Sequence, residues 1–382
     1  MNEIPETKKG IFMTFKKILH ILPQFQPGGG MERVVMNYFN NIDHNQYQFD
    51  IIAHKIEDDA YAKQIEEAGG KVYALDPVSL KSIKRNEERF QKILDEGHYN
   101  AVHCHMANAA FLYLKIAKMN GIPLRILHSH QDHYADTKLH ALRNIPLVAF
   151  GKRYANYRVA CSQTSGKFLF GSQDYTVIKN GIDFRDFHFD LESRKRYREK
   201  LHLNNDELLL GQIGRLVPQK NPLFSIRVLY ELQKRHSNAR LIFAGDGSLR
   251  LDAEQLAKNL NISDKIDFLG NQDDVTELYN ALDVLLMPSL YEGVSLSLVE
   301  SQATGLLSLA SDTITDEAFA SSYAIPLSLN DGPQGWAQAV LEEMQSGASH
   351  NRSKGIAQLR QNGYDAKECT ERIEAVYASL LS

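Results

Sequence analysis

The sequence contains few cysteines and no long apolar run. Its 382 residues include three cysteines, Cys104, Cys161 and Cys369, which are odd in number and far apart. They predict neither a disulfide framework nor a cysteine metal site. No apolar stretch approaches the length that a membrane span needs. The charged N-terminal segment is not followed by the sustained apolar region of a secretory signal. We therefore expect a protein of the reducing cytoplasm.

Charge is unevenly distributed along the chain. Residues 1–186 contain 24 basic and 20 acidic residues, and the remainder contains 19 basic and 27 acidic residues. The basic first part could contact an anionic membrane surface peripherally, although a chance distribution of solvated charges explains the asymmetry equally well. The cations considered for this contact are Lys81, Lys84, Arg85, Lys152 and Arg153. No nucleic acid partner is expected.

Short apolar runs alternate with longer amphipathic stretches throughout the chain, which predicts βαβ units and parallel sheets. The expected strands are 16–22, 49–54, 71–76, 101–105, 125–130, 157–162 and 175–180 in the first half, and 208–216, 239–247, 265–270, 283–289, 306–311 and 323–328 in the second. Composition and length suit two domains of a globular protein. We predict an α/β fold with two Rossmann-like, doubly wound domains at 1–186 and 187–355, followed by a helical tail at 356–382.

Two carboxylates, Glu292 and Glu300, flank the turn between the apolar strand DVLLMPS and a helix that ends at Gly305. In open α/β sheets ligands bind at the carboxyl ends of strands, where helix N-termini offer free N–H groups. One ligand could therefore touch both carboxylates. The alternative is a pair of exposed helix-start carboxylates that the helix dipole favours.

A basic loop, GRLVPQKNP, lies between another strand and a helix. Asn221 is expected to cap that helix and Pro222 to be its first residue. A guanidinium from Arg215 and an ammonium from Lys220 at a helix start would clamp a diphosphate. Two surface cations in a polar loop are the alternative.

Three glycines, Gly28 to Gly30, separate the first strand from the first helix. Glycines at this place allow a phosphate or sugar to approach the backbone closely. A nicotinamide site fits poorly, because the spacing is not G-x-G-x-x-G and no acidic residue ends the second strand. A plain tight turn remains the alternative.

The first half is also rich in histidine, with pairs at His103/His105 and His128/His130. We expect the two rings of each pair to point to opposite faces of the sheet, so that one ring of each pair faces the cleft. These rings together with His133 could suggest zinc, but no helical H-x3-H or H-E-x-x-H pattern supports it. We expect no metal.

The motifs together resemble a known family. The E-x7-E spacing of Glu292 and Glu300, the G-R-x4-K segment of Gly214, Arg215 and Lys220, FAGDGSLR and KIDFLG follow one another in the order typical of retaining GT-B glycosyltransferases that use nucleotide sugars. From KILHILPQFQPGGG to the QNGYDA tail, the chain resembles the bacterial exopolysaccharide and capsule enzymes of this family. The resemblance implies that the tail helices cross back onto the first domain.

The resemblance also implies roles for individual residues. Catalysis is expected from His130, Glu292, Arg215 and Lys220. Donor binding is expected from Gly29, Gly30, Gly214, Arg215, Lys220, Gly245, Asp246, Phe268, Leu269, Glu292, Val294, Ser295, Leu296 and Glu300, and acceptor binding from His105, His128 and Gln131. Val294 and Ser295 depart from the aromatic and glycine of many relatives, which leaves the sugar and the acceptor open.

These motifs predict a retaining hexosyltransferase that uses a nucleotide diphosphate sugar, UDP-linked in our reading, and a lipid-linked or growing saccharide acceptor. Cationic residues would stabilise the leaving diphosphate, so neither a cofactor nor a divalent metal is expected. No carboxylate is clearly placed as a nucleophile, which favours front-face displacement. The alternatives are a UDP-sugar epimerase or phosphorylase of the same architecture, and a non-catalytic nucleotide-sugar-binding subunit.

Overall fold

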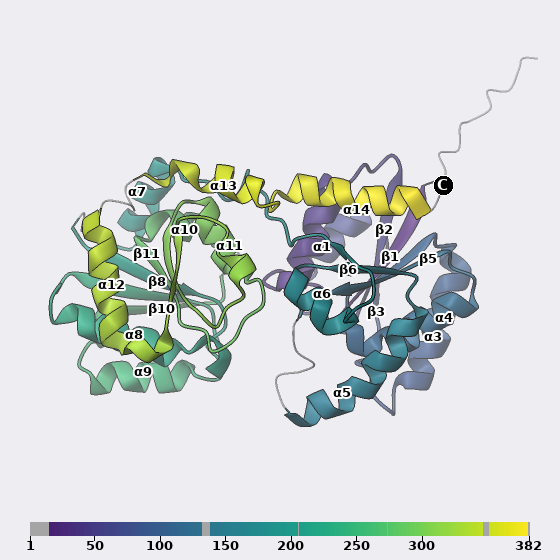
Figure 1. Ribbon diagram of the computed structural model, residues 1–382, viewed down its shortest axis with the longest axis horizontal. Coiled ribbons are helices and arrows are strands. Elements are labelled where there is room, and N and C mark those ends of the chain that lie inside the picture. Colours follow the sequence, from purple (N-terminus) through teal and green to yellow (C-terminus); the bar gives the residue numbers. More distant parts are fainter. Residues whose placement is uncertain (1–14, 132–137, 205, 273, 347–350, 381–382) are drawn as a thin grey trace, which may run out of the picture.

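The computed structural model describes residues 15–131, 138–204, 206–272, 274–346 and 351–380. It contains two parallel sheets, each covered by helices on both faces, and the two units lie side by side (Figure 1). The first sheet has the strand order β3-β2-β1-β4-β5-β6-β7 and the second β10-β9-β8-β11-β12-β13. The predicted α/β class with two doubly wound domains is confirmed.

The first domain contains every strand expected in the first half of the sequence. Its strands are β1 (Lys16–Leu22), β2 (Tyr47–Ala53), β3 (Val72–Ala74), β4 (Ala101–Cys104), β5 (Leu124–Ser129), β6 (Tyr157–Ala160) and β7 (Thr176–Val177). Its helices are α1 (Gly30–Asn41), α2 (Ala60–Glu67), α3 (Ile83–Gly97), α4 (Ala110–Met119), α5 (Lys138–Gly151) and α6 (Gln163–Phe170). Strands covered on both faces read as continuous apolar runs, which is why they were recognisable.

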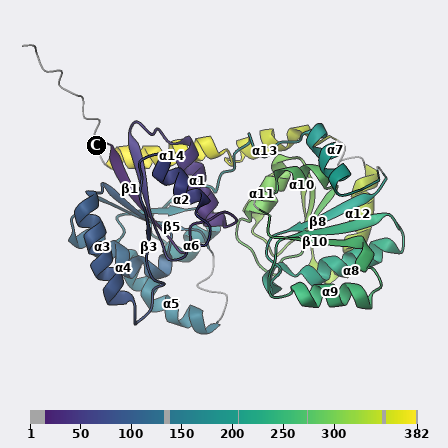
Figure 2. The same cartoon turned by 180° about the vertical axis from the view of Figure 1, so that it is seen from behind.

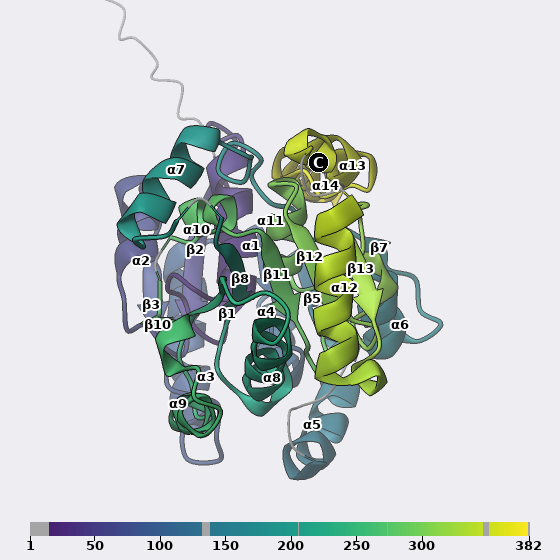
Figure 3. The ribbon, with the colours of Figure 1, turned by 90° about the vertical axis from the view of Figure 1, so that its left-hand side faces the viewer.

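The second domain repeats this arrangement. Its strands are β8 (Leu208–Ile213), β9 (Ala239–Ala244), β10 (Ile266–Gly270), β11 (Val284–Met287), β12 (Leu307–Ser311) and β13 (Ala324–Leu327). Its helices are α7 (Leu191–Lys200), α8 (Pro222–Gln233), α9 (Arg250–Asn259), α10 (Thr276–Ala281), α11 (Leu296–Ala303) and α12 (Gly332–Ser346). Figure 3 looks onto this domain along the long axis of the molecule, with α12 in front.

Each sheet separates two apolar layers. Along β1, Leu19 and Ile21 face the layer that holds α3 and α4, while Ile18 and Leu22 face the layer that holds α1. In the second domain α8, α9 and α12 cover one face and α7, α10 and α11 the other. This follows from the alternation of side chains along a strand.

The tail returns to the first domain, as Figures 1 and 2 show from opposite sides. Helix α13 (Gly355–Gln361) still belongs to the second domain, where Leu359 is part of the core. Helix α14 (Ala366–Leu380) then packs beside α1 and places Ile373 and Tyr377 in the first core. The chain therefore crosses over a few residues after the predicted boundary at 355/356.

Both sheets have a topological switch point. The strand order reverses between β1 and β4 in the first sheet and between β8 and β11 in the second. At such a point the loops leaving the carboxyl ends of neighbouring strands run to opposite faces of the sheet, which leaves a crevice for a ligand. The predicted site residues follow these strands.

Candidate functional site

The loops after β8 and β9 pack backbone against backbone. Gly214 and Gly245 both have positive φ, at +132° and +144°, and the Gly214 N–H donates to the Ala244 carbonyl (2.9 Å). A Cβ added at Gly245 would lie 2.1 Å from the Gly214 carbonyl oxygen. Only glycine is compatible with this approach, so both predicted glycines shape the floor of the site.

The basic loop follows directly. Arg215 is exposed, and its guanidinium has no hydrogen bond or ion pair with any residue that the structure describes. Lys220 ends a short 3-10 turn whose position is fixed by the Gln212 side-chain amide, which donates to the Lys220 carbonyl (2.7 Å). Helix α8 begins at Pro222 as predicted. Asn221 occupies the cap position in a left-handed conformation (φ 52°), and its side chain does not cap the helix.

Glu292 meets Lys220 across the switch point. Lys220 Nζ lies 2.7 Å from Glu292 Oε1, and the two side chains are 14% and 11% exposed. The loop after β11 is joined to the basic loop by two further bonds, from Leu290 N–H to the Gln219 carbonyl (2.8 Å) and from the Gln219 amide to the Tyr291 carbonyl (3.1 Å). A carboxylate predicted near the sugar and a cation predicted at the diphosphate are thus direct partners.

Glu300 is held differently. It is 1% exposed in α11, accepts a hydrogen bond from the Tyr279 hydroxyl (2.9 Å) and forms an ion pair with Arg33 of α1. The Glu300 carboxylate raises the pKa of Arg33, and burial, followed by this carboxylate, raises the pKa of Tyr279. Neither partner follows from the sequence motifs: Arg33 lies 267 positions from Glu300, and Tyr279 belongs to the preceding helix α10.

The Arg33–Glu300 pair joins the two domains, and the glycine turn lies beside it. A Cβ added at Gly30 would be 3.8 Å from Cδ1 of Leu296 at the start of α11, and Leu296 packs with Met31 against the first core. The structure therefore brings Gly30, Leu296 and Glu300 together from both domains, as predicted for one site.

The other residues predicted for the donor contribute unequally. The Phe268 ring stacks on Phe243 (centroids 5.1 Å apart) beneath the Arg250 guanidinium, and Leu269 is partly buried against the second core. Asp246 accepts a bond from the N–H of Gly247 (2.7 Å). Val294 packs against the second core, and Ser295 Oγ lies 3.1 Å from Ser297 Oγ.

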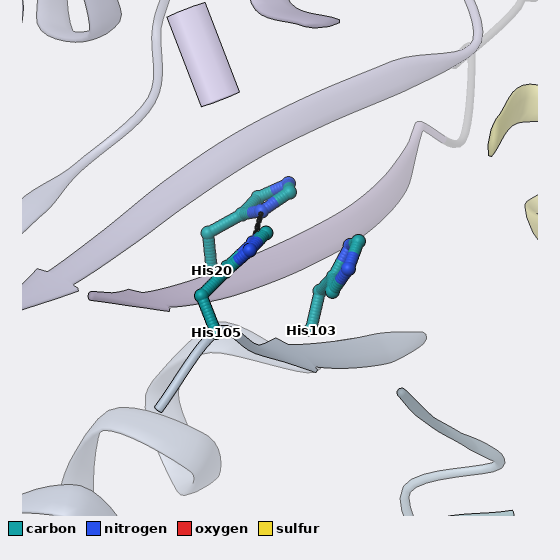
Figure 4. A group of neighbouring side chains, drawn as sticks. All are labelled: His20, His103 and His105. Carbon is teal, nitrogen blue, oxygen red and sulfur yellow. Dashed lines mark hydrogen bonds between the residues drawn. The ribbon is translucent and has the colours of Figure 1, made fainter. Parts of the chain in front are cut away.

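The histidine pairs do not point to opposite faces, so that expectation was wrong. The rings of His103 and His105 stack with centroids 4.3 Å apart, and those of His128 and His130 lie 4.0 Å apart. Side chains two residues apart in a strand return to the same face. His20 of β1 joins them; Figure 4 shows it bonded to His105 with His103 alongside.

A cavity of about 200 Å³ in the first domain is lined by His105, His128, His130 and Gln131. His128 is fully buried, whereas His130 is partly exposed and Gln131 is exposed. Burial lowers the pKa of His130 to about 4 and, helped by neighbouring histidines, lowers the pKa of His105 and His128. These rings are therefore neutral at pH 7. His133 lies outside the described residues.

This arrangement suits an anionic ligand with a polar second part. An exposed guanidinium and an ammonium before the start of α8 can bind a diphosphate, while the carboxylate in the loop before α11 and the one inside α11 can accept bonds from hydroxyl groups. Among the described residues, no helix combines the length and apolarity needed to cross a bilayer.

Two family models match the chain. The model "Glycosyltransferase Family 4" matches residues 28–186, and "Glycosyl transferases group 1" matches residues 193–317. The first match covers the glycine turn and the histidines, and the second covers the basic loop and both carboxylates. Together they span most of both domains.

Individual proteins are also similar to this chain over nearly its whole length. EpsF of Bacillus subtilis strain 168, named as a glycosyltransferase, is 29% identical over 379 residues, 95% of this chain and 96% of its own length. An Escherichia coli enzyme named UDP-Gal:alpha-D-GlcNAc-diphosphoundecaprenol alpha-1,3-galactosyltransferase is 22% identical over 382 residues, with coverage of 96% and 97%. The Anabaena protein Alr3699/HepE, solved with UDP, superposes with a TM-score of 0.78 at 18% identity, over 95% of this chain and 100% of that one, and shares the fold.

Proposed function

Because this chain belongs to the GT-B glycosyltransferases described by these two family models, we propose that it moves a hexosyl group from a UDP-sugar to a lipid-linked saccharide with retention of configuration, in the synthesis of a bacterial exopolysaccharide or capsule. The observation that carries this proposal is the Lys220–Glu292 pair across the β8/β11 switch point, with Arg215 unpaired among the described residues beside it. The family models describe transferases, which favours transfer over epimerisation or binding alone.

Arg215 and Lys220 act on the leaving group. Negative charge grows on the diphosphate as the bond to the sugar breaks, and fixed cations in a partly buried site stabilise that charge without reorganising. Lys220 is held in place by Glu292 (2.7 Å) and by the bond to its carbonyl. When Lys220 shares its ammonium with a phosphate, the Glu292 carboxylate can orient the sugar and offset positive charge at the reacting carbon. No divalent metal is needed for this step.

Glu300 holds the ribose. Tyr279 retains one carboxylate oxygen, and the other, paired with Arg33 in this structure, accepts bonds from the ribose hydroxyls. Nucleotide binding is thereby coupled to the contact between the domains, since the ribose and Arg33 compete for one oxygen. His130, at the cavity of the first domain, contacts the sugar from the opposite side.

Transfer occurs on one face of the sugar. The bond between the anomeric carbon and the leaving phosphate oxygen breaks, the acceptor oxygen bonds to the same face, and the acceptor proton passes to the leaving phosphate. This scheme needs no enzyme nucleophile. His105, His128 and Gln131 line the cavity on the acceptor domain and position the incoming saccharide.

The lipid part of the acceptor implies work at the cytoplasmic face of a membrane. Helix α5 exposes Leu142 (70%), Ile145 and Phe150, with Arg143 beside them and Arg153 over the Phe150 ring. A basic, apolar helix face of this kind lies in the interface of an anionic bilayer. Lys152 contributes less than expected, because its ammonium bonds the Leu169 carbonyl (2.7 Å). Arg85 is likewise paired with Asp76.

A thermal-shift panel of nucleotide sugars tests the donor, because a ligand that binds only the folded chain stabilises it by about 2.7 kcal/mol at 100 times its Kd. The stabilising donor is then incubated with polyprenyl-diphosphate saccharides in EDTA, and the anomeric configuration of the product is read by NMR. Transfer with retention is expected. Binding without hydrolysis or transfer would favour the non-catalytic alternative, and an inverted product would refute front-face displacement.

A further inference from the structure

Five histidines, four of them buried and His130 partly exposed, form a continuous array in the first domain, and the proposed reaction uses only part of it. His20, His103 and His128 are fully buried. Ring nitrogens lie 3.0 Å apart between His20 and His105, 3.1 Å between His103 and His128, and 2.8 Å between His105 and His130. A row of imidazoles this dense exceeds what packing requires, since each ring buries two polar atoms.

Two groups of three rings within this array bring ligand nitrogens within 4.8 Å of one another: His20 with His103 and His105, and His105 with His128 and His130. Only the second group lines the 200 Å³ cavity with all three of its members. An ion there could keep a position open to water, as zinc held by three histidines does. The first group, drawn in Figure 4, has only His105 at the cavity.

Two rings of the second group, His105 and His128, have another ring nitrogen beside their outer nitrogen. His105 Nε2 lies beside His20 Nδ1, and His128 Nδ1 lies beside His103 Nε2. The outer nitrogen of His130 is Nδ1, which is buried and has no hydrogen-bond partner among the described residues, and the same is true of the side-chain oxygen of Asn180. Asn180 offsets part of the effect by which burial lowers the pKa of His130. Metal-bound imidazoles almost always donate their other N–H in this way.

The inner nitrogens are left for an ion. His128 Nε2 is buried and has no partner among the described residues, while His105 Nδ1 and His130 Nε2 face each other at 2.8 Å. Nitrogen–zinc bonds of about 2.0–2.1 Å in a tetrahedral site place two nitrogens roughly 3.3 Å apart. The His105 and His130 nitrogens would therefore have to separate by about half an ångström, and the ligand nitrogen of His128 lies within 4.8 Å of both.

We propose that His105, His128 and His130 bind one transition-metal ion of the Zn²⁺ class at this cavity. Imidazole suits zinc, cobalt, nickel and copper, whereas Mg²⁺ and Mn²⁺ prefer oxygen ligands. The ion is separate from the diphosphate clamp on the second domain, so it does not serve the leaving group. The ion holds the His130 ring, which would otherwise contact the sugar. Metal binding therefore slows transfer. This last consequence rests on the proposed function.

The full-length protein, stripped with EDTA, is titrated with Co²⁺ as an optical probe of tetrahedral coordination. We expect one equivalent to bind with intense visible absorption that Zn²⁺ displaces. His128→Gln and His130→Gln should each weaken binding by at least about 100-fold, and His20→Gln, which removes an outer partner, by roughly 10-fold to 100-fold. His188→Gln, an exposed histidine outside the array, should bind as the parent does.

Folding of each variant is checked by its melting temperature and circular dichroism spectrum, because the histidines of the array lie in the first domain. On the unaltered chain, Zn²⁺ should also protect His130 from diethyl pyrocarbonate, as mass spectrometry would show. The site is overturned if Co²⁺ does not bind, if binding survives in His128→Gln and His130→Gln, or if His20→Gln abolishes binding while His130→Gln does not. Metal binding that leaves transfer unchanged overturns the coupling and the role of His130 at the sugar, but not the metal site.

Discussion

The two carboxylates of the site should respond differently to the same substitution. Glu292 contacts Lys220, and Glu300 contacts Arg33 and Tyr279. Glu292→Gln keeps the size of the side chain but removes the charge that we propose to offset positive charge at the reacting carbon. An interaction that is stronger in the transition state than in the ground state affects turnover rather than binding. We expect kcat to fall by roughly 10²-fold or more, about 2.7 kcal/mol of transition-state stabilisation.

In Glu292→Gln, UDP affinity should stay the same or increase slightly, although kcat falls. In the parent, Lys220 is paired with Glu292, and under the proposed function it would be shared between Glu292 and the phosphate. Glu292→Gln leaves the ammonium to the phosphate alone, so UDP should bind as tightly as before or a few times more tightly. Glu300→Gln should instead weaken both UDP and the UDP-sugar, because it removes a ribose acceptor that serves ground and transition states alike.

Calorimetric titration of UDP and steady-state rates decide between these outcomes. Glu199→Gln, an exposed carboxylate on α7, is the matched control and should change neither quantity. Because breaking a buried ion pair costs several kcal/mol of folding stability, melting temperatures of all three variants are compared first. Equal loss of UDP affinity in Glu292→Gln and Glu300→Gln, or full turnover in Glu292→Gln, would refute these assignments.

Four further outcomes are expected. Transfer should survive EDTA; its abolition by the chelator and recovery with Mn²⁺ or Mg²⁺ would show that Arg215 and Lys220 do not suffice. Arg33→Gln should tighten UDP binding by up to roughly tenfold, about 1.4 kcal/mol, in calorimetry, and weaker binding would mean that Arg33 turns to the nucleotide. Full-length protein should float with anionic liposomes at low salt and lose this binding in Leu142→Ser/Ile145→Ser; no flotation of the parent contradicts the membrane contact. Burial lowers the pKa of His20 to about 3 and that of His130 to about 4. In EDTA, the free energy of unfolding should therefore be constant above pH 6.5 and fall below pH 6.5 by about 1.4 kcal/mol per histidine per pH unit. Urea unfolding at pH 7 and at pH 5.5 measures this difference.

The fold could be predicted from the sequence because its strands are easy to recognise. A strand with helices on both faces must be apolar throughout, so β1, β8 and β11 stood out as continuous runs. The predicted boundary of the tail at 355/356 lies before the point where the chain crosses to the first domain, because α13 has the same helical spacing in the sequence as α14. Only packing distinguishes them: Gly355 lies against the carbonyl of Gln302, where a Cβ would not fit.

The site was only partly accessible. Motif order predicted Lys220, Glu292 and Glu300 for one site, and these assignments stay predictions; their partners depend on which loops meet. Arg33 reaches Glu300 from another domain, and Tyr279 reaches it from α10. The apolar residues of α5 could not be assigned to the surface, since sequence alone does not show which helix lacks a covering layer. The prediction that the two histidine rings of a pair point to opposite faces was wrong, because side chains two residues apart in a strand lie on the same face.

The pairing of both carboxylates changes what donor affinity measures. Lys220 and Arg33 already balance Glu292 and Glu300, so a donor bound at the proposed site would share or replace these partners instead of meeting isolated charges. The measured binding energy is then the difference between the contacts that the donor makes and the ion pairs that it replaces. Because Arg33 belongs to the first domain and Glu300 to the second, one of those exchanges alters the contact between domains. Linkage is reciprocal: if the ribose displaces Arg33, whatever strengthens the Arg33–Glu300 contact must weaken nucleotide binding by the same factor.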